Sequence, residues 1–277
     1  MRFAICNETF QDWPFDKAFR FAAELGYSGL EIAPFTINVN AYEISPARRA
    51  EVRRQADDAG LEIIGLHWLL AKTTGYYLTT PDDAVRHKTS DYLGELARLC
   101  RDLGGNVMVL GSPMQRNLLP GVSHEQGMEL AADCLRRAMP TLEQCQVTLA
   151  VEPLGPKDGN FLLTAAAGRQ LCEMVGSPHC RLHLDCKAMA SESKPIPQLL
   201  RENASLLEHF HANDPNMRGP GMGELDFLPI FQALSDIDYR GWVSVEVFDY
   251  TPGVEALARE SIDYLEDCEA DLAAPDR

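Results

Sequence analysis

The feature that most constrains this chain is an alternation of short aliphatic runs with longer amphipathic segments, repeated eight times. Short apolar runs are typical of buried parallel strands, and apolar residues spaced three to four apart are typical of helices that cover a sheet. Eight such pairs within 277 residues match the size of a closed (β/α)8 barrel, the TIM barrel architecture. We therefore predict a single α/β domain over residues 1–277.

The eight aliphatic runs place the predicted strands at Phe3–Cys6, Gly29–Ile32, Glu62–Leu66, Val107–Leu110, Val147–Val151, Arg181–Asp185, Leu206–His211 and Trp242–Val247. The predicted helices are Phe15–Leu25, Pro46–Ala59, Asp82–Leu103, Glu125–Gln144, Thr164–Val175, Pro197–Glu202, Leu228–Leu234 and Gly253–Cys268. Four glycines stand where helix C-caps belong, namely Gly26, Gly60, Gly104 and Gly176.

Charge and composition exclude several classes of partner. The net charge is −16 and the basic residues form no run, which argues against nucleic acid. No apolar stretch approaches the roughly 18 residues of a membrane span. The eight cysteines include no CxxC pair and no disulfide-scaffold spacing, so we expect reduced thiols and a cytoplasmic protein. A homodimer or homotetramer remains open.

Polar residues stand at the ends of the last four predicted strands. Alternate side chains of a barrel strand point to the helices and to the interior. In these strands one parity is apolar, and the opposite parity directs four side chains inward at the carboxyl ends, namely Glu152, Asp185, His211 and Glu246. One such residue is more often a cap or a loop anchor than a ligand. Four on the same rim point to a site, and this face carries the active site in such barrels.

These four side chains suit one divalent cation. Three carboxylates close together raise each other's pKa unless a cation neutralises them. Three oxygen donors and one imidazole favour Mn²⁺, with Mg²⁺ next, over a thiolate-type zinc site, and Zn²⁺ or Co²⁺ remain open.

At these same residues the sequence resembles the sugar phosphate isomerase/epimerase family of xylose isomerase-like barrels, especially its D-tagatose/D-psicose 3-epimerase branch. The matching stretches are Gly26–Ile32, Val151–Gly155, Leu184–Asp185, His211–Asp214, Gly219–Gly223 and Val245–Glu246. Together they span most of the chain. The resemblance implies a metal-dependent ketose 3-epimerase or isomerase acting on a small sugar.

The resemblance also implies residue roles. Glu152, Asp185, His211 and Glu246 would bind one metal ion, and Glu152 and Glu246 would serve as the acid/base pair in enediolate chemistry. Arg218, before the Gly-Pro-Gly turn, would match a substrate-contacting arginine.

Two positions depart from that branch. Its members usually carry a histidine three residues after the ligand aspartate, where this chain has Ala188, and a glutamate where it has Asp158. We therefore expect a substrate other than the usual free ketohexose, with Asp158 contacting it.

Three further residues are candidates for substrate contact. Glu31 and His67 stand at strand ends, where each would either hydrogen-bond a sugar hydroxyl or play a structural part. Lys187 would either bind a carbonyl or a phosphate of the substrate or remain solvated. His183 and His209 lie deeper, as interior groups that orient ligands.

Other functions remain as alternatives. A lyase or dehydratase would use the same metal and base on a sugar or a cyclic hydroxy acid. A hydrolase of the apurinic endonuclease branch would need more histidine ligands and a basic channel. A non-catalytic binding barrel would be expected to have lost at least one metal ligand.

Overall fold

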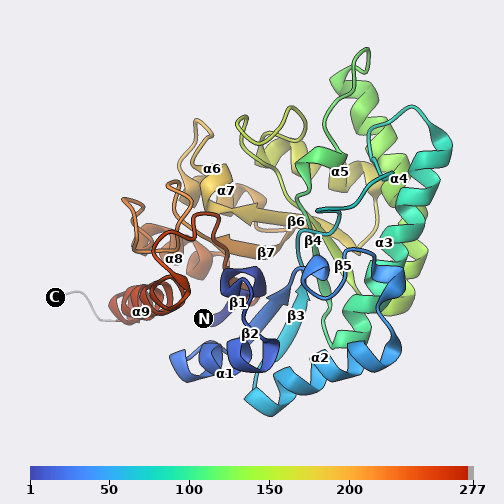
Figure 1. Ribbon diagram of the computed structural model, residues 1–277. Coiled ribbons are helices and arrows are strands. Elements are labelled where there is room, and N and C mark those ends of the chain that lie inside the picture. Colours follow the sequence, from blue (N-terminus) through green and yellow to red (C-terminus); the bar gives the residue numbers. More distant parts are fainter. Residues whose placement is uncertain (274–277) are drawn as a thin grey trace.

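Eight parallel strands close into a barrel in the computed structural model, which describes residues 1–273 (Figure 1). The strands are β1 (Arg2–Cys6), β2 (Gly29–Ile32), β3 (Glu62–Leu66), β4 (Val107–Leu110), β5 (Thr148–Val151), β6 (Cys180–Asp185), β7 (Leu207–Ala212) and β8 (Trp242–Val245). Each strand pairs with the next along the chain, and β1 pairs with β8 to close the ring. The predicted (β/α)8 barrel is confirmed. Residues 274–277 of the predicted domain lie outside the described residues.

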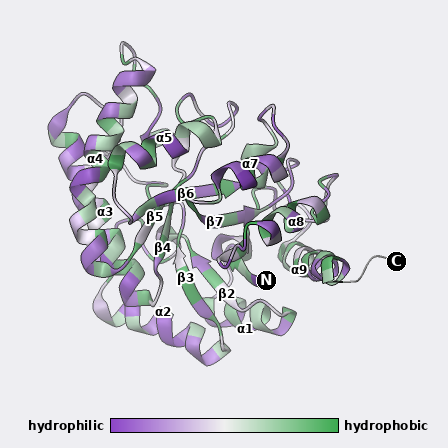
Figure 2. Ribbon diagram, turned by 180° about the vertical axis from the view of Figure 1, so that it is seen from behind, coloured by the Kyte–Doolittle hydropathy of each residue, from purple (hydrophilic) through white to green (hydrophobic). Residues whose placement is uncertain are grey.

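Helices surround this barrel and follow the strands in sequence (Figure 1). They are α1 (Phe15–Leu25), α2 (Pro46–Ala59), α3 (Asp83–Leu103), α4 (His124–Cys145), α5 (Ala165–Val175), α6 (Cys186–Met189), α7 (Ile196–Asn203), α8 (Leu228–Asp236) and α9 (Val254–Ala273). Figure 2 shows hydrophobic and hydrophilic residues alternating along the outer helices, as expected of helices with one buried face. Within residues 1–273, no helix is both long and apolar enough to cross a membrane.

Capping residues define where these helices begin and end. Ser45 accepts a hydrogen bond from the backbone N–H of Arg48, and Pro46 occupies the first turn of α2. The four predicted C-cap glycines all adopt left-handed backbone conformations, with φ between 72° and 107°. The glycines in the sequence therefore predicted where these helices end and the chain turns back toward the barrel.

The strand parity predicted from the sequence is confirmed by the packing. The apolar residues of the last four strands, among them Leu149, Leu182 and Val243, belong to a large cluster shared with the helices. Two small clusters fill the barrel interior, one of Ala4, Ile64 and Trp242 and the other of Val107, Val109 and Ala150.

Most predicted elements begin or end one or two residues away from their observed bounds, β8 among them. Strand β8 ends at Val245 rather than Val247, because the N–H groups of Phe248 and Asp249 donate to the carbonyl of Met217 in the loop after β7. The short helix α6 was not predicted, and α9 extends to Ala273 rather than ending at Cys268.

Candidate active site

The structure brings together the four side chains predicted to share one rim. Glu152 follows β5, Asp185 ends β6, His211 lies near the end of β7 and Glu246 follows β8. One potential ligand atom from each lies within 4.8 Å of the others, and none of the four is more than 7% exposed. The register of the sheet explains this convergence, since Asp185 pairs with His211 across the β6/β7 ladder.

Hydrogen bonds hold three of these side chains in place. His211 lies between two carboxylates, with Nδ1 3.0 Å from Oε2 of Glu246 and Nε2 3.0 Å from Oε2 of Glu31. Asp185 accepts hydrogen bonds from the backbone N–H of Ala188 at 2.7 Å and from the side-chain amide of Asn213 at 2.5 Å. Each polar group is thereby oriented before any substrate arrives.

The indole of Trp68 fixes the remaining oxygen of Glu246. Its Nε1 donates to Oε1 of Glu246 at 2.7 Å, while the ring stacks on Phe248 with centroids 6.2 Å apart. Trp68 has a left-handed backbone conformation with φ of 52°, which is uncommon for a non-glycine residue and often marks a functional segment.

A glycine makes room for Glu152. A Cβ atom on Gly111 would lie 2.1 Å from Oε2 of Glu152, well inside van der Waals contact. Any other residue at position 111 would displace the carboxylate or the strand end that carries it.

The electrostatics of the cluster reflect burial and crowding. Burial, with the nearby charges of Glu246 and Asp185, raises the pKa of Glu152 well above its ordinary value. Burial and Glu246 raise the pKa of Asp185 to about 6. Burial would raise the pKa of Glu246 as well, but the charge and hydrogen bond of His211, together with His67 and Trp68, hold that pKa below its usual range. Buried carboxylates this close favour the binding of a cation.

A cavity of about 410 Å³ opens onto this cluster. Glu152 and Glu246 form part of its lining, together with Trp68 and Phe248. Two of the predicted substrate contacts, Asp158 and Lys187, also line it.

Asp158 and Lys187 form an ion pair at the cavity wall. Nζ of Lys187 lies 2.9 Å from Oδ2 of Asp158 and 4.8 Å from the centroid of the Phe248 ring. Burial would lower the pKa of Lys187, but its hydrogen bond to Asp158 and the charges of the nearby carboxylates together raise it. Lys187 therefore presents a paired charge to the cavity.

The other three predicted substrate contacts are not among the residues that line this cavity. Glu31 is fully buried and accepts from His209 at 2.8 Å, a contact that matches the structural part left open for it beside a sugar contact. His67 is likewise fully buried, with Nε2 2.7 Å from Oε2 of Glu8. Arg218 pairs with Asp249 at 2.9 Å, which turns its guanidinium toward the loop after β8.

The two deeper histidines lie inside the barrel as expected. His183 is fully buried, its ring centroid 4.2 Å from that of His211. Nε2 of His183 lies 3.9 Å from Oε1 of Glu152. The ring of His209 lies edge-on to that of His211, with centroids 5.2 Å apart, and both rings contact the carboxylate of Glu31.

Two buried charged residues near the site escaped the sequence interpretation. Glu8 lies in the short 3-10 helix Asn7–Phe10 after β1, where an acidic residue directly beyond an apolar strand was the available signal. Arg116 is 1% exposed and donates through Nη1 to the carbonyl of Leu110 at 3.1 Å, and burial lowers its pKa to about 10. No strand pattern marks a loop arginine as buried.

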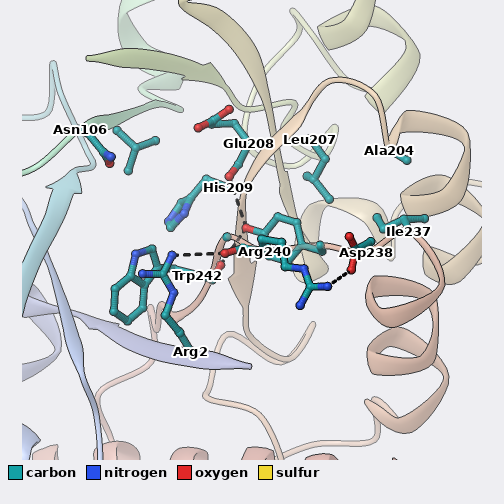
Figure 3. A pocket seen from close by; sticks show the side chains of 13 residues that line it. Arg2, Asn106, Ala204, Leu207, Glu208, His209, Ile237, Asp238, Arg240 and Trp242 are labelled. Atoms are coloured by element: carbon teal, nitrogen blue, oxygen red, sulfur yellow. Dashed lines mark hydrogen bonds and ion pairs between the residues drawn. The ribbon is translucent and has the colours of Figure 1, made fainter. Parts of the chain in front are cut away.

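A second hollow, of about 370 Å³, lies at the opposite end of the barrel, where the strands begin (Figure 3). Arg2 covers the Trp242 ring with its guanidinium carbon 4.2 Å from the centroid, and it donates to the carbonyl of Arg240 at 3.2 Å. Tyr239 donates to the carbonyl of Trp242 at 2.9 Å. These contacts link the starts of β1 and β8, which is a stabilising role typical of this face of a barrel.

Comparison with known proteins decides the family. The family model described as xylose isomerase-like TIM barrel matches residues 19–268. The chain belongs to this family. The resemblance inferred from the sequence motifs is thereby confirmed.

Named relatives cover nearly the whole chain. It is 25% identical over 275 residues to a probable ketose 3-epimerase of Synechocystis. This match covers 90% of this chain and 89% of that protein. It is 24% identical over 277 residues to a 3-dehydro-D-guloside 4-epimerase of Escherichia coli, and this match covers 97% of this chain and 100% of that protein. Both relatives are named as epimerases, which are isomerases, in agreement with the class predicted from the sequence.

A solved structure supports the fold. The crystal structure of D-psicose 3-epimerase with D-tagatose, from Clostridium cellulolyticum, superimposes with a TM-score of 0.85 at 20% identity. The match covers 99% of this chain and 100% of that chain.

Proposed function

We propose that this protein is a metal-dependent sugar epimerase of the ketose 3-epimerase type, in which Glu152 and Glu246 transfer the proton. The observation that carries the proposal is that these two carboxylates line one cavity and belong to a buried cluster with Asp185 and His211. The named epimerases that resemble the chain along most of its length support the same class.

The donor set fits one divalent cation. Glu152, Asp185, His211 and Glu246 offer three carboxylate oxygens and one imidazole nitrogen, all buried and close together. Hard oxygen donors with a single imidazole favour Mn²⁺. When bound there, the cation supplies electrostatic stabilisation for the negative charge that develops on a substrate carbonyl and hydroxyl in an enediolate.

The two glutamates reach the cavity from different parts of the barrel, since β6 and β7 separate the strands they follow. A sugar carbon held between them exposes one face to each carboxylate. One glutamate removes the proton and the other returns a proton to the opposite face, which inverts the carbon. His211 and Trp68 hold Glu246 in place through its two oxygens.

The ion pair of Asp158 and Lys187 is proposed to contact the substrate. Together the two side chains offer acceptors and donors to sugar hydroxyls or to a carbonyl at the same part of the wall. With alanine at position 188, this pair replaces the histidine that the resemblance leads one to expect.

The test is solvent deuterium incorporation, followed by NMR, into ketoses, ketose phosphates and 3-keto sugars with Mn²⁺ or with EDTA. Metal-dependent exchange at one carbon with inversion supports the proposal. Loss of water from the substrate identifies the lyase instead, and the absence of exchange with every sugar overturns the epimerase.

A further inference from the structure

We propose that a second divalent cation binds beside the first, held by Cys6, Glu8, His67 and Glu246. The inference goes beyond the proposed function and rests on it only through Glu246, which the two sites share. One potential ligand atom from each of these four residues lies within 4.8 Å of the other three. All four side chains are buried.

Neighbouring strands of the closed barrel assemble this second group. Cys6 ends β1 and Glu8 follows it, His67 follows β3, and Glu246 follows β8. Because β8, β1, β2 and β3 are consecutive in the ring, these residues occupy the half of the rim away from Glu152. Glu246 stands at the boundary between the two groups.

Two members of the group have polar atoms without hydrogen-bond partners among the described residues. These are both carboxylate oxygens of Glu8 and both ring nitrogens of His67. The side chains are 6% and 0% exposed. Nε2 of His67 lies 2.7 Å from Oε2 of Glu8, yet the two atoms lack the alignment of a hydrogen bond. Leaving such groups buried and unpartnered is costly, and a cation between them satisfies both.

The charges in the barrel mouth also favour a second cation. Four buried carboxylates follow or end their strands there, those of Glu8, Glu152, Asp185 and Glu246, and Glu31 lies deeper, in contact with His209 and His211. One divalent ion offsets only part of this negative charge, and buried charges without compensation are strongly unfavourable.

A separate cavity gives access to the second group. Glu8 lines a cavity of about 580 Å³ whose walls include Trp13, Phe35 and Tyr250. Trp68 and Lys72 line both this cavity and the one that opens onto Glu152. Of the four proposed ligands, Glu8 lines this second cavity, whereas Glu246 lines the first.

The donors differ between the two groups. The second offers a thiol sulfur, an imidazole nitrogen and carboxylate oxygens, where the first offers no sulfur. Sulfur with nitrogen and oxygen donors suits Zn²⁺ or Co²⁺, whereas the first group suits Mn²⁺. We therefore infer that the second site prefers the softer ion.

The experiment is a Co²⁺ titration of the metal-stripped protein, read by bound metal per chain and by thiolate-to-cobalt charge-transfer absorption. The expected result is about two ions per chain together with that absorption. The Cys6→Ser variant should lose the absorption, and Glu8→Gln should reduce binding to about one ion. The control Cys100→Ser changes another buried cysteine, on α3, and should retain both signals.

The Asp185→Asn variant separates this inference from the proposed function, because it weakens the first site and should leave the absorption intact. Absorption that persists in Cys6→Ser, or wild-type protein that binds one ion without the absorption, overturns the second site. One ion with the absorption in the wild type supports the second site and contradicts the first.

Discussion

Oε2 of Glu31 lies 3.0 Å from Nε2 of His211, on the side of the imidazole away from Glu246. His209 contacts the same oxygen at 2.8 Å. A carboxylate behind a metal-binding histidine fixes its ring orientation and tautomer. We therefore propose that Glu31 acts through His211, as a positioning residue for the proposed metal.

This relationship predicts the effect of Glu31→Gln. The amide lacks the charge that orients the histidine, so the affinity for Mn²⁺ should fall by roughly 10- to 100-fold with the fold retained. Calorimetric titration of the metal-stripped protein measures the affinity. Glu62→Gln, an exposed change on β3, should bind as the wild type does. Unchanged affinity in Glu31→Gln would show that Glu31 serves only to fill the barrel.

Gly111 should be sensitive to a single methyl group. In Gly111→Ala the new Cβ would approach Oε2 of Glu152 to 2.1 Å, so Glu152 must move. Misplacement on the scale of an ångström costs about 100-fold in rate, which steady-state kinetics would detect. Gly60→Ala is the matched control, since its Cβ meets no atom within 4 Å but its φ is 76°. It should lose about 1 kcal/mol of stability and keep its activity. Equal activity of the two variants would contradict this role of Gly111.

The ion pair of Lys187 and Asp158 should determine substrate affinity. Lys187→Met and Asp158→Asn should each raise KM about tenfold with a smaller effect on kcat, because the pair is proposed to contact the substrate away from the proton transfer. The increase in KM of the double variant should be smaller than the product of the two single increases, which corresponds to a coupling energy of about 1 kcal/mol. Fully multiplicative effects would mean that the two side chains act independently.

Metal removal should destabilise the protein. A free Mn²⁺ concentration of about 100 times Kd adds about 2.7 kcal/mol to the free energy of unfolding. This corresponds to a rise in Tm of roughly 5–10 °C for a chain of this size. Differential scanning fluorimetry with Mn²⁺ and with EDTA measures the shift. Asp185→Asn should show a much smaller shift, and a full shift in that variant would place the stabilising ion elsewhere.

The sequence predicted the barrel and the four converging rim residues because both depend on local pattern. Strand parity and the order of the strands are enough to direct Glu152, Asp185, His211 and Glu246 to one end of the ring. The helix ends were predictable for the same reason, since a glycine such as Gly60 marks its own C-cap.

The placement of Glu31, His67 and Arg218 depended on contacts that local pattern does not carry. The ladder between β2 and β3 shifts its register between Leu30 and Glu31, and Glu31 meets histidines from distant strands inside the barrel. Arg218 pairs with Asp249, which is 31 residues away in sequence. Only the folded chain brings these partners together.

The most direct test of the central claim is the rate of solvent deuterium incorporation into the substrate by wild-type protein, Glu246→Gln and Glu152→Gln, with bound metal measured for each. Both variants should keep the folded barrel and exchange at least about 100-fold more slowly, also at Mn²⁺ concentrations that load each variant fully. Glu255→Gln, an exposed change on α9, should exchange at the wild-type rate. Wild-type exchange by either active-site variant would contradict proton transfer by this pair of glutamates.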